Sequence, residues 1–496
     1  MHASQFSGFG LLLLARASVA AVVQYRQAPD FSDASYGWSP ETIVSIQGTP
    51  EFENATERWD IYMEPTYSVA ISPASEADVV TAVKAAQEHG LPLLATGGRH
   101  GFSTTLGQMK GGVAIDLSQL DSVVVDKNSS TLTIGGGVHF GQVFDPVYNA
   151  GFQVPTGTAS CPGMVSVTVG GGIGRLNGLD GMVLDSLLSV RIVTANGTLL
   201  EASETSNSDL FWGIRGAGHN FGVIVSATYQ LYPLYNGGDW TSVDLIVPLE
   251  KNVSYFDAVA SLLPLPAQLT VQTMVTYNTA TNQTQLMASL VYGGSQEDAL
   301  KAMAPVLDLG PFDYQNVSTI AWNKLASEAM FQIGAAICVR GGISDVYGFN
   351  LKAFDAPTWS SSLQKMSDFY AANPDARGSV ILLESWPNEA VQAVPEDETA
   401  YPWRDVTTYG LIQFRWGDLG DVASQTAANS LGPELRSDFA ATSGYDGLTV
   451  YVNYAAGDES LEQIYGDKLP RLASLKAKYD PDNVFKFYHA LPTSYP

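Results

Sequence analysis

Cationic residues and cysteines are scarce in this sequence. Its 496 residues include 25 Lys and Arg against 50 Asp and Glu, which gives a net charge of −25 at pH 7. A charge of this sign repels a phosphate backbone and argues against nucleic-acid binding. Beyond the N-terminus no run of about 20 apolar residues occurs, so we expect no membrane-spanning helix. Only Cys161 and Cys338 are present, and in a secreted protein they are compatible with one disulfide.

The N-terminus carries a candidate export signal. A short apolar run in FSGFGLLLLARASVAAVVQ leads to small residues up to Ala21, although Arg16 directly follows the run and no Lys or Arg precedes it. An amphipathic, frayed start therefore stays open as the alternative. We expect a signal peptide over residues 1–21 and a secreted product. The sequons that support secretion, and at which we expect glycans, are Asn54, Asn128, Asn196, Asn252, Asn282 and Asn316.

The length favours two domains, because a single core stops growing at roughly 250–300 residues. Residues 65–235 alternate strand and helix patterns, for example a strand, a Ser75 helix cap, a helix that ends near Gly90 and a second strand. From about residue 236 longer helical stretches replace the glycine clusters. The last segment includes an alternating strand pattern in GLTVYVNYAAGD. The predicted divisions are residues 22–64, 65–235, 236–440 and 441–496.

Three glycine-rich loops lie beside predicted strands: ATGGRHGFS at 95–103, VGGGIG at 169–174 and RGAGHNFG at 215–222. Glycine permits positive φ and lets backbone N–H groups approach a phosphate-bearing ligand closely. Neither the G-x-x-x-x-G-K-[ST] motif of nucleotide triphosphatases nor the G-x-G-x-x-G spacing of a Rossmann turn matches these loops. Tight turns in a compact sheet remain the structural alternative.

Five segments between about residue 60 and residue 490 resemble, in the same order, the berberine-bridge-enzyme-like FAD-linked oxidoreductases of the vanillyl-alcohol-oxidase type. They are ATGGRHGFSTTLG, SCPGMVSVTVGGGIGRLNGLDGMVLDSLLSVRIVTANG, DLFWGIRGAGHNFGVI, VYVNYAAGD and KYDPDNVF. The GGRH variant is similar to the fungal branch. The resemblance implies an α+β fold. Its FAD-binding domain, of PCMH type with two α/β subdomains, would occupy residues 65–235, and residues 441–496 would return to it. Residues 236–440 would form a substrate domain of antiparallel sheet covered by helices.

The resemblance also implies how the cofactor is held. In the family a loop His bonds to the flavin 8α-methyl group and, in many members, a Cys bonds to flavin C6; His100 and Cys161 match these positions. FAD would thus be bicovalent and Cys338 an unpaired thiol, with a Cys161–Cys338 disulfide as the alternative. Neither anchor lies in a metal-ligand spacing, and we expect no metal. The further cofactor-binding residues implied, each of which could equally be a turn residue, are Thr96, Gly97, Gly98, Arg99, Gly101, Thr158, Gly163, Ser166, Gly171, Ile224 and Asn483.

Catalysis in such a protein needs a base beside flavin N5. The resemblance points to Tyr454 or Tyr451, which would face opposite sides of a strand, and we expect Tyr454 to be the base. Either tyrosine could instead be a core aromatic. Met164 occupies the position that governs O₂ access in relatives, and we favour an oxidase over a dehydrogenase. Aromatics that could line a substrate pocket, or simply pack in the core, are Trp322, Phe331, Trp386, Tyr401, Trp403 and Trp416.

The sequence therefore predicts a secreted FAD-dependent oxidoreductase that acts on a small molecule. It would oxidise an alcohol or phenol group of a secondary metabolite or carbohydrate by hydride transfer to the flavin, with O₂ as the acceptor. The alternative is a flavin-containing cyclase that closes a ring without net redox change.

Overall fold

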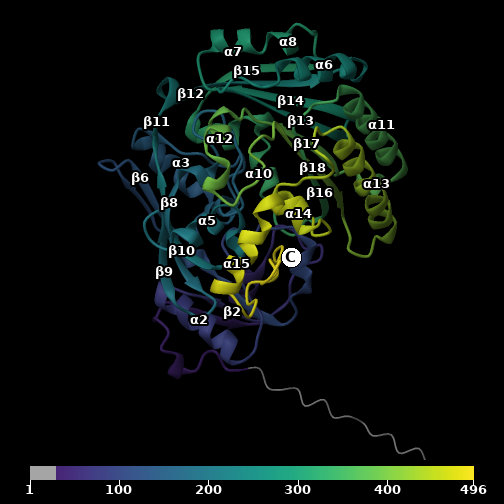
Figure 1. The fold of residues 1–496 in the computed structure, drawn as a ribbon. Coiled ribbons are helices and arrows are strands. Elements are labelled where there is room, and N and C mark those ends of the chain that lie inside the picture. Colours follow the sequence, from purple (N-terminus) through teal and green to yellow (C-terminus); the bar gives the residue numbers. More distant parts are fainter. Residues whose placement is uncertain (1–28, 496) are drawn as a thin grey trace, which may run out of the picture. The chain divides into compact units, whose positions relative to one another are not determined.

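The computed structural model describes residues 29–495, and residues Phe31–Pro496 form one compact unit built on three main sheets (Figure 1). Helices and antiparallel sheets are mixed along the chain, as the predicted α+β class requires. The predicted signal peptide falls on residues outside the described part of the chain. Within that part, no helix is long and apolar enough to cross a membrane.

The first sheet places the first glycine loop. Its strand order is β1 (Ile43–Ile46), β2 (Tyr67–Ser72), β4 (Gly112–Asp116) and β3 (Leu93–Thr96), and β4 runs parallel to both β2 and β3. Helix α1 (Pro50–Thr56) precedes β2, and α2 (Glu76–Glu88) connects β2 to β3. The Ser75 side chain caps α2 by accepting from the Asp78 amide, and Gly90 is left-handed just after the helix. The predicted strand–helix–strand unit is therefore confirmed, and β3 leads directly into residues 97–101.

The second sheet carries the other two glycine loops. Its order is β5 (Val123–Asp126), β6 (Thr131–Gly135), β10 (Gly222–Gln230), β8 (Leu187–Thr194) and β9 (Leu199–Ser203), all antiparallel. Two hairpins, β5–β6 and β8–β9, belong to this sheet. Helices α3 (Phe140–Asn149), α4 (Met164–Thr168) and α5 (Ser208–Ala217) accompany this sheet, and a short pair joins β7 (Phe152–Gln153) to β11 (Tyr232–Pro233).

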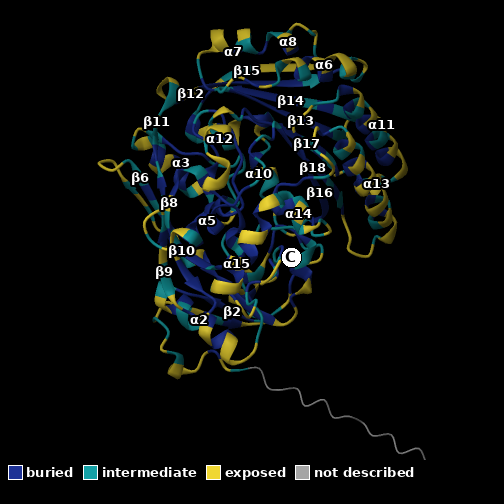
Figure 2. Cartoon of the chain, in the orientation of Figure 1, coloured by how far each residue is buried: buried dark blue, intermediate teal, exposed yellow. Residues whose placement is uncertain are grey.

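The third sheet has seven antiparallel strands, in the order β15 (Tyr314–Ala321), β12 (Asp239–Val247), β14 (Gln283–Tyr292), β13 (Leu269–Asn278), β17 (Val380–Ser385), β18 (Thr408–Trp416) and β16 (Ile343–Leu351). The larger helices that pack on one face are α6 (Asn252–Leu262), α11 (Ala356–Ala372) and α13 (Val422–Ala441) (Figure 1). Shorter helices of this region are α7 (Gln296–Ala302), α8 (Ala304–Leu307), α9 (Leu325–Glu328), α10 (Gly334–Ile337) and α12 (Glu389–Ala393). Figure 2 shows strands β13, β14 and β17 buried and α7 largely exposed.

Side chains alternate across this third sheet. On β17, Ile381 and Leu383 belong to the core beneath the helices. Because successive side chains of a strand point to opposite faces, Glu384 points away from those helices. It is one of the residues that line the cavity described below.

The strand predicted around Tyr451 is wrong. Residues Val452–Tyr454 form a single 3₁₀ turn, in which the Tyr454 amide donates to the Tyr451 carbonyl at 2.7 Å. The backbone here crosses β16 closely: a Cβ atom at Gly348 would lie 2.3 Å from the Tyr454 carbonyl oxygen. The alternating apolar pattern around Tyr451 therefore reflects burial of this segment on several sides, and the segment is not a strand. Helices α14 (Leu461–Tyr465) and α15 (Leu469–Tyr479) follow.

Candidate active site

A cavity of about 310 Å³ lies between the glycine loops, the third sheet and the C-terminal segment. Residues from all these regions, far apart in sequence, line it together. Most of the residues expected at the cofactor site line this cavity: Thr96, Gly97, Gly98, Arg99, His100, Gly101, Thr158, Gly163, Ser166, Ile224, Tyr451 and Tyr454. Cys161, Gly171 and Asn483 are not among the lining residues.

The first glycine loop touches the loop of residues 161–163 through its backbone. A Cβ atom at Gly98 would lie 2.4 Å from the Gly163 amide nitrogen and 2.8 Å from the Cys161 carbonyl oxygen. Contacts this short are closer than a side chain allows, so glycine is required at position 98. Because Gly98 has no side chain, the His100 loop can lie against the Cys161 loop.

His100 is held as a neutral imidazole. Its ring stacks on Trp59, with centroids 4.6 Å apart and planes inclined by 21°, and its Nε2 lies 3.2 Å from Cys161 Sγ. Burial, with the nearby Arg340 and Arg58 guanidinium groups acting in the same direction, lowers the pKa of His100 to about 3. Because sulfur is a weak acceptor, the contact fits an Nε2–H donor, which leaves Nδ1 as the ring nitrogen with a lone pair.

The expectation that Cys338 is an unpaired thiol is wrong in this structure, because Cys161 and Cys338 form a disulfide. Cys338 directly follows α10, and three contacts hold this segment against residues 57–59, where Trp59 stacks on His100. Trp59 Nε1 donates to the Ile337 carbonyl at 2.7 Å, Arg340 Nη1 donates to the Glu57 carbonyl at 2.7 Å, and the Gly341 amide donates to the Arg58 carbonyl at 2.9 Å. Spacing in the sequence contains no signal that the two cysteines meet, since 177 positions separate them.

The polar groups at the cavity fit the phosphate-bearing cofactor that the sequence implies. The Thr96 hydroxyl and His219 Nδ1 are buried without a hydrogen-bond partner in residues 29–495, although both residues line the cavity. Within the same residues, the amides of positions 98–101 donate no hydrogen bond. The Arg99 side chain points elsewhere, into a buried 2.5 Å ion pair with Asp116, so only its backbone faces the cavity. The unused amides and the Thr96 hydroxyl around a glycine-lined cavity suit the diphosphate and flavin edges of FAD. His219 Nδ1 is an acceptor, because Nε2 of this neutral ring donates to the Ser166 carbonyl.

In a part of the cavity wall formed by the third sheet and the C-terminal segment, Tyr454 and Glu384 form a buried pair. The Tyr454 hydroxyl donates to Glu384 Oε2 at 2.5 Å. Burial raises the pKa of Glu384 to about 7, against the lowering effect of the hydrogen bonds from Tyr454 and Gln272 and of the Arg175 charge. Burial and the adjacent carboxylate raise the pKa of Tyr454 well above its usual value. The phenol therefore stays protonated, beside a carboxylate that changes charge near neutrality.

Tyr451 has a different environment on the same side of the turn. Its oxygen accepts from the Gly172 amide at 2.8 Å and from Asn453 Nδ2 at 2.6 Å. The two tyrosine rings are 5.1 Å apart, and both line the cavity. A 3₁₀ turn has three residues per turn, which aligns positions i and i+3. The expectation that the tyrosines face opposite sides is therefore wrong.

Three other residues from the sequence analysis, Gly171, Asn483 and Met164, do not line the cavity. A Cβ atom at Gly171, whose φ is 138°, would lie 2.9 Å from the Tyr451 ring, so this glycine permits close packing. Asn483 has a left-handed backbone in the turn after α15, and its buried Oδ1 has no partner in the described part of the chain. Met164 is fully buried in the core, whereas the neighbouring Val165 lines the cavity.

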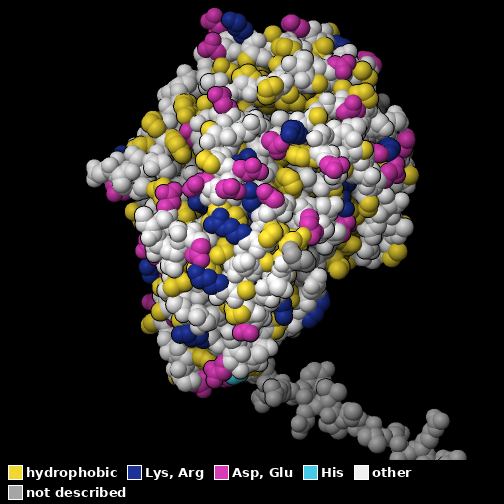
Figure 3. Space-filling model, in the orientation of Figure 1, with side chains coloured by type: hydrophobic (Ala, Val, Ile, Leu, Met, Phe, Trp, Pro, Cys, Tyr) yellow, Lys and Arg dark blue, Asp and Glu magenta, His cyan; other side chains and the backbone are white. Residues whose placement is uncertain are grey.

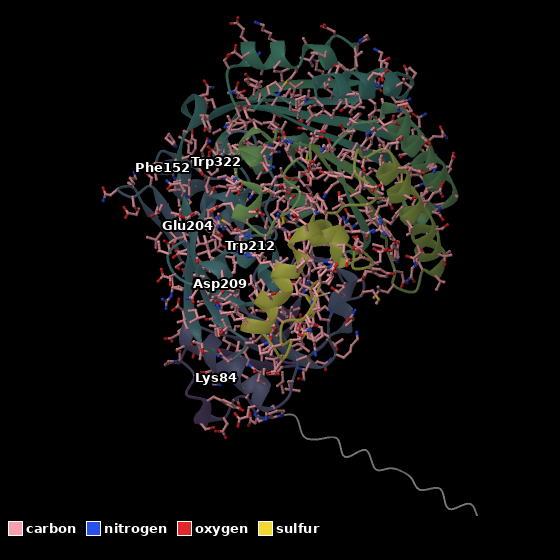
Figure 4. All side chains as sticks on the ribbon, in the orientation of Figure 1. Lys84, Phe152, Glu204, Asp209, Trp212 and Trp322 are labelled. Carbon is pink, nitrogen blue, oxygen red and sulfur yellow. A yellow bond between two sulfur atoms is a disulfide. The ribbon has the colours of Figure 1, made fainter. Side chains whose placement is uncertain are left out.

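The candidate pocket aromatics do not line the cavity. Trp322, labelled in Figure 4, packs edge to face on Phe144 in the core of the second sheet, and Trp416 belongs to the core of the third. Trp386 and Tyr401 are buried in a compact aromatic cluster, against which Trp403 packs. Phe331 is half-buried with a left-handed backbone. Four of these side chains therefore pack in the core, which was the alternative to a pocket role: Trp322, Trp386, Tyr401 and Trp416.

The asparagines of the sequons are accessible. Asn54, Asn128, Asn196, Asn282 and Asn316 are exposed, and Asn252 is half-buried with its Nδ2 bonded to the Leu249 carbonyl. Asp and Glu side chains are spread over the face drawn in Figure 3, interspersed with Lys and Arg. This distribution agrees with the net charge of −25.

Glu384 is the functional residue that reasoning from the sequence missed. A signal for it exists, because it is the only charged residue in the apolar strand segment SVILLESW. A carboxylate in such a strand is costly to bury unless it is hydrogen-bonded. That cost marks the position as a candidate site residue.

Comparisons with known proteins agree with this geometry. Residues 67–203 match the family model described as FAD binding domain, and residues 450–492 match the one described as berberine and berberine like. The two matches cover the glycine loops around His100 and Cys161 and the segment with Tyr451 and Tyr454. The fold and the cavity thus define a flavoprotein with an FAD-binding domain.

The chain belongs to the berberine-like FAD-linked oxidoreductases. FAD-linked oxidoreductase OXR1 of Pyricularia oryzae is 55% identical over 460 residues, which cover 92% of this chain and 90% of that protein. The predicted family, its fungal relatives and the oxidoreductase activity are confirmed.

Solved structures share the fold. Physcomitrella patens BBE-like 1 has a TM-score of 0.81 at 20% identity, over 92% of this chain and 98% of that one. Glucooligosaccharide oxidase from Acremonium strictum, described with a 6-S-cysteinyl, 8α-N1-histidyl FAD, has a TM-score of 0.79 at 20% identity, over the same shares. The predicted PCMH-type α+β fold is confirmed.

Proposed function

We propose that this FAD-linked oxidoreductase is a secreted oxidase that dehydrogenates an alcohol or phenol group of a secondary metabolite or carbohydrate. The observation that carries the proposal is the buried hydrogen bond from Tyr454 to Glu384 at the cavity wall. Bound FAD supplies a hydride acceptor at N5. What the protein must add is a base for the hydroxyl proton of the substrate.

Tyr454 and Glu384 supply that base as a pair. An ordinary tyrosine titrates near pH 10, and burial raises the pKa of Tyr454 further, so its phenolate is not available in advance. Glu384 solves this problem by accepting the Tyr454 proton while the Tyr454 oxygen takes the proton of the substrate hydroxyl. A carboxyl group with a pKa of about 7 can accept and release a proton near neutral pH.

His100 attaches the flavin through Nδ1 in this proposal. A neutral imidazole retains the lone pair that forms the bond, and the low pKa of His100 keeps the ring neutral. Stacking on Trp59 fixes the plane of the ring. The neighbouring Arg58 and the residues Thr96–Gly101 would surround the rest of the cofactor.

Cys161 is the second anchor only when it is a thiol. Its sulfur lies beside His100, as attachment to the same ring edge requires, but the disulfide with Cys338 occupies it. We therefore propose two covalent forms: His100 alone holds the flavin while the disulfide is closed, and both residues hold it when Cys338 does not compete.

The disulfide and the exposed sequons support the secretory pathway, where disulfides persist. Oxygen as electron acceptor rests on the likeness to oxidases of the same fold. Because Met164 is buried in the core, Val165 is the side chain of that segment best placed to affect O₂ access.

Anaerobic stopped-flow reduction tests the proposed function. The holoenzyme is mixed with a panel of oligosaccharides and aromatic alcohols, and bleaching of the oxidised flavin is recorded. We expect at least one class to reduce the flavin, and O₂ then to restore its colour with formation of hydrogen peroxide. A substrate that is converted to a cyclic product of unchanged oxidation state, without bleaching, would instead establish the cyclase.

Peptide mapping without reducing agent tests the attachment. We expect the flavin mass on the His100 peptide and a Cys161–Cys338 cross-linked peptide in the wild type. In Cys338→Ser the flavin should appear on the Cys161 peptide as well. A flavin-free His100 peptide in both proteins would overturn the attachment, and the same map would locate glycans at the six sequons and the mature N-terminus.

A further inference from the structure

The hydrogen bonds of Glu384 continue away from the cavity. Gln272 on β13 donates from Nε2 to Glu384 Oε1 at 3.1 Å, and its own Oε1 accepts from Arg175 Nη2 at 3.3 Å. Gln272 and Glu384 are register partners on adjacent strands, so their side chains share one face of the sheet. A buried chain therefore connects Tyr454, Glu384, Gln272 and Arg175, and joins the second glycine loop to the third sheet.

Arg175 is a buried cation. It is 7% exposed, and its Nε has no hydrogen-bond partner in the described residues. Burial lowers the pKa of Arg175 to about 10, and the charges of Glu384 and Asp244 oppose that shift, so the group remains cationic at neutral pH. Asp244 Oδ2 accepts from the Phe331 amide, so this carboxylate is already engaged elsewhere. Burying a charge costs free energy. The positive charge of Arg175 acts on Glu384, where it favours the ionised carboxylate.

The Arg175 guanidinium fixes the direction of the Gln272 amide. A guanidinium can only donate, so the Gln272 atom that faces Arg175 must be the amide oxygen. The amide nitrogen then faces Glu384 and donates to it, while the Tyr454 hydroxyl donates to the other carboxyl oxygen. Both oxygens of Glu384 accept in this arrangement, which matches an ionised carboxylate. A protonated carboxyl would have to carry its proton on Oε2 and reverse the bond with Tyr454, because Oε1 faces the amide nitrogen of Gln272.

We propose that Arg175 is a positioning residue that, by fixing the direction of the Gln272 amide, keeps Glu384 ionised and ready to take the proton of Tyr454. Without the guanidinium, Gln272 could turn its amide and offer its oxygen to a protonated Glu384. Besides Arg175 and Tyr454, the titratable groups near Glu384 in residues 29–495 are Tyr451 and Tyr409, its register partner on β18, and burial raises the pKa of both, so both are neutral. This inference rests on the proposed function, because a preferred charge on Glu384 matters for catalysis only if Glu384 accepts that proton.

Infrared titration of the holoenzyme tests the inference without any substrate. The protonated carboxyl band of Glu384 is identified by its loss in Glu384→Gln, and its pH dependence is measured in the wild type, Arg175→Met and Gln272→Leu. In both variants we expect Glu384 to hold its proton to higher pH, with a ratio of protonated to ionised carboxyl about tenfold larger near neutrality. Arg215→Met is the matched control, because Arg215 is also 7% exposed but donates to Glu398, outside this chain.

Anaerobic flavin reduction provides the kinetic arm. In Arg175→Met the rate should fall about tenfold below neutral pH and recover as the pH rises, whereas a loss of packing would slow the reaction equally at every pH. If Arg175→Met does not fold, Gln272→Leu decides the question. An unchanged Glu384 titration in the variant that folds, or an equal shift in Arg215→Met, overturns the inference. If instead Glu384 titrates as expected and no substrate bleaches the flavin, the proposed function fails and the role of Arg175 in setting the charge stands.

Discussion

Two parts of the cavity wall, the attachment end around His100 and the catalytic end around Glu384, use burial in opposite ways. At the attachment end, burial and two guanidinium groups keep His100 neutral, with a pKa of about 3. At the catalytic end, burial raises the pKa of a carboxyl group to about 7, and hydrogen bonds together with one distant guanidinium limit the rise. The same physical cause, removal of charge from water, thus prepares a neutral nucleophile at one end and a proton acceptor at the other.

The ends also differ in how the chain builds them. His100 and the Cys161 loop lie in neighbouring segments that meet through glycine contacts. Tyr454, Glu384 and Gln272 come from the C-terminal turn and two strands of the third sheet. The attachment end depends on close backbone approach, whereas the catalytic end depends on register across a sheet.

The largest expected effect is that of Tyr454→Phe. The substitution keeps the ring and its packing but removes the hydroxyl, so reduction of the flavin by substrate should slow by about 10²–10⁴-fold. Flavin content should not change, because the attachment end is untouched. Anaerobic stopped-flow measures this step apart from reoxidation, and an unchanged rate would remove Tyr454 from the mechanism.

Glu384→Gln should slow the same step by about 10²-fold and remove its dependence on pH near neutrality. In the wild type the rate should rise as the pH increases through about 7 and then level off, since only the ionised carboxylate accepts a proton. The stability of the folded protein depends on pH in the opposite direction to the rate. The pKa of Glu384 in the folded protein is raised above the value of 4.5 for an exposed carboxyl, so its contribution to stability is complete at acid pH and is lost as the pH rises through 7. A rate profile without an acid limb would contradict the role of Glu384.

Gly98→Ala should disturb the attachment end. The added methyl group would lie 2.4 Å from the Gly163 amide nitrogen, and relief of this overlap should cost about 1–3 kcal/mol of unfolding free energy. The fraction of covalent flavin should fall as the two loops separate. Gly417→Ala is the control, because nothing lies within 4 Å of its added Cβ. Equal denaturation midpoints for the two variants would show that the loops are not in close contact.

Tyr451→Phe should have the smallest effect on the rate. The Tyr451 oxygen accepts two hydrogen bonds from the protein and has no carboxylate partner, so its loss leaves the Gly172 amide without an acceptor and Asn453 Nδ2 with the Val167 carbonyl alone. The cost should be about 1–3 kcal/mol of stability, with flavin reduction changed only slightly. If this variant slows reduction more than Tyr454→Phe does, the roles of the two tyrosines are reversed.

Local features of the fold could be predicted from the sequence, and long-range contacts could not. The cap at Ser75, the left-handed Gly90 and the hairpin at Asn196 each result from a few adjacent residues. The identification of His100 and Tyr454 as site residues came from family motifs. That Tyr451 faces the same cavity as Tyr454 depends on a 3₁₀ turn forced by packing across β16, which an alternating pattern does not reveal.

The contact of Glu384, which was missed, and the disulfide, which was only the alternative expectation, both join distant segments. Glu384 reaches Tyr454 across 70 positions, and Cys161 reaches Cys338 across 177. Both pairings depend on how the third sheet docks on the glycine loops. Periodicity and residue spacing report only what happens within an element, so neither could have predicted these pairs.

The Cys161–Cys338 bond also constrains the unfolded chain. It closes a loop that includes most of the second sheet and the first half of the third, and its ends are 177 positions apart in the sequence. In the chain-entropy description, a loop of this size removes about 5 kcal/mol of conformational freedom from the unfolded ensemble. A flavin bond at Cys161 instead would release this constraint, since the cofactor does not tie residue 161 to residue 338. The choice of partner for one sulfur atom therefore decides whether the FAD-binding loops and the substrate sheet can separate when the protein unfolds, or stay joined as a single covalent ring.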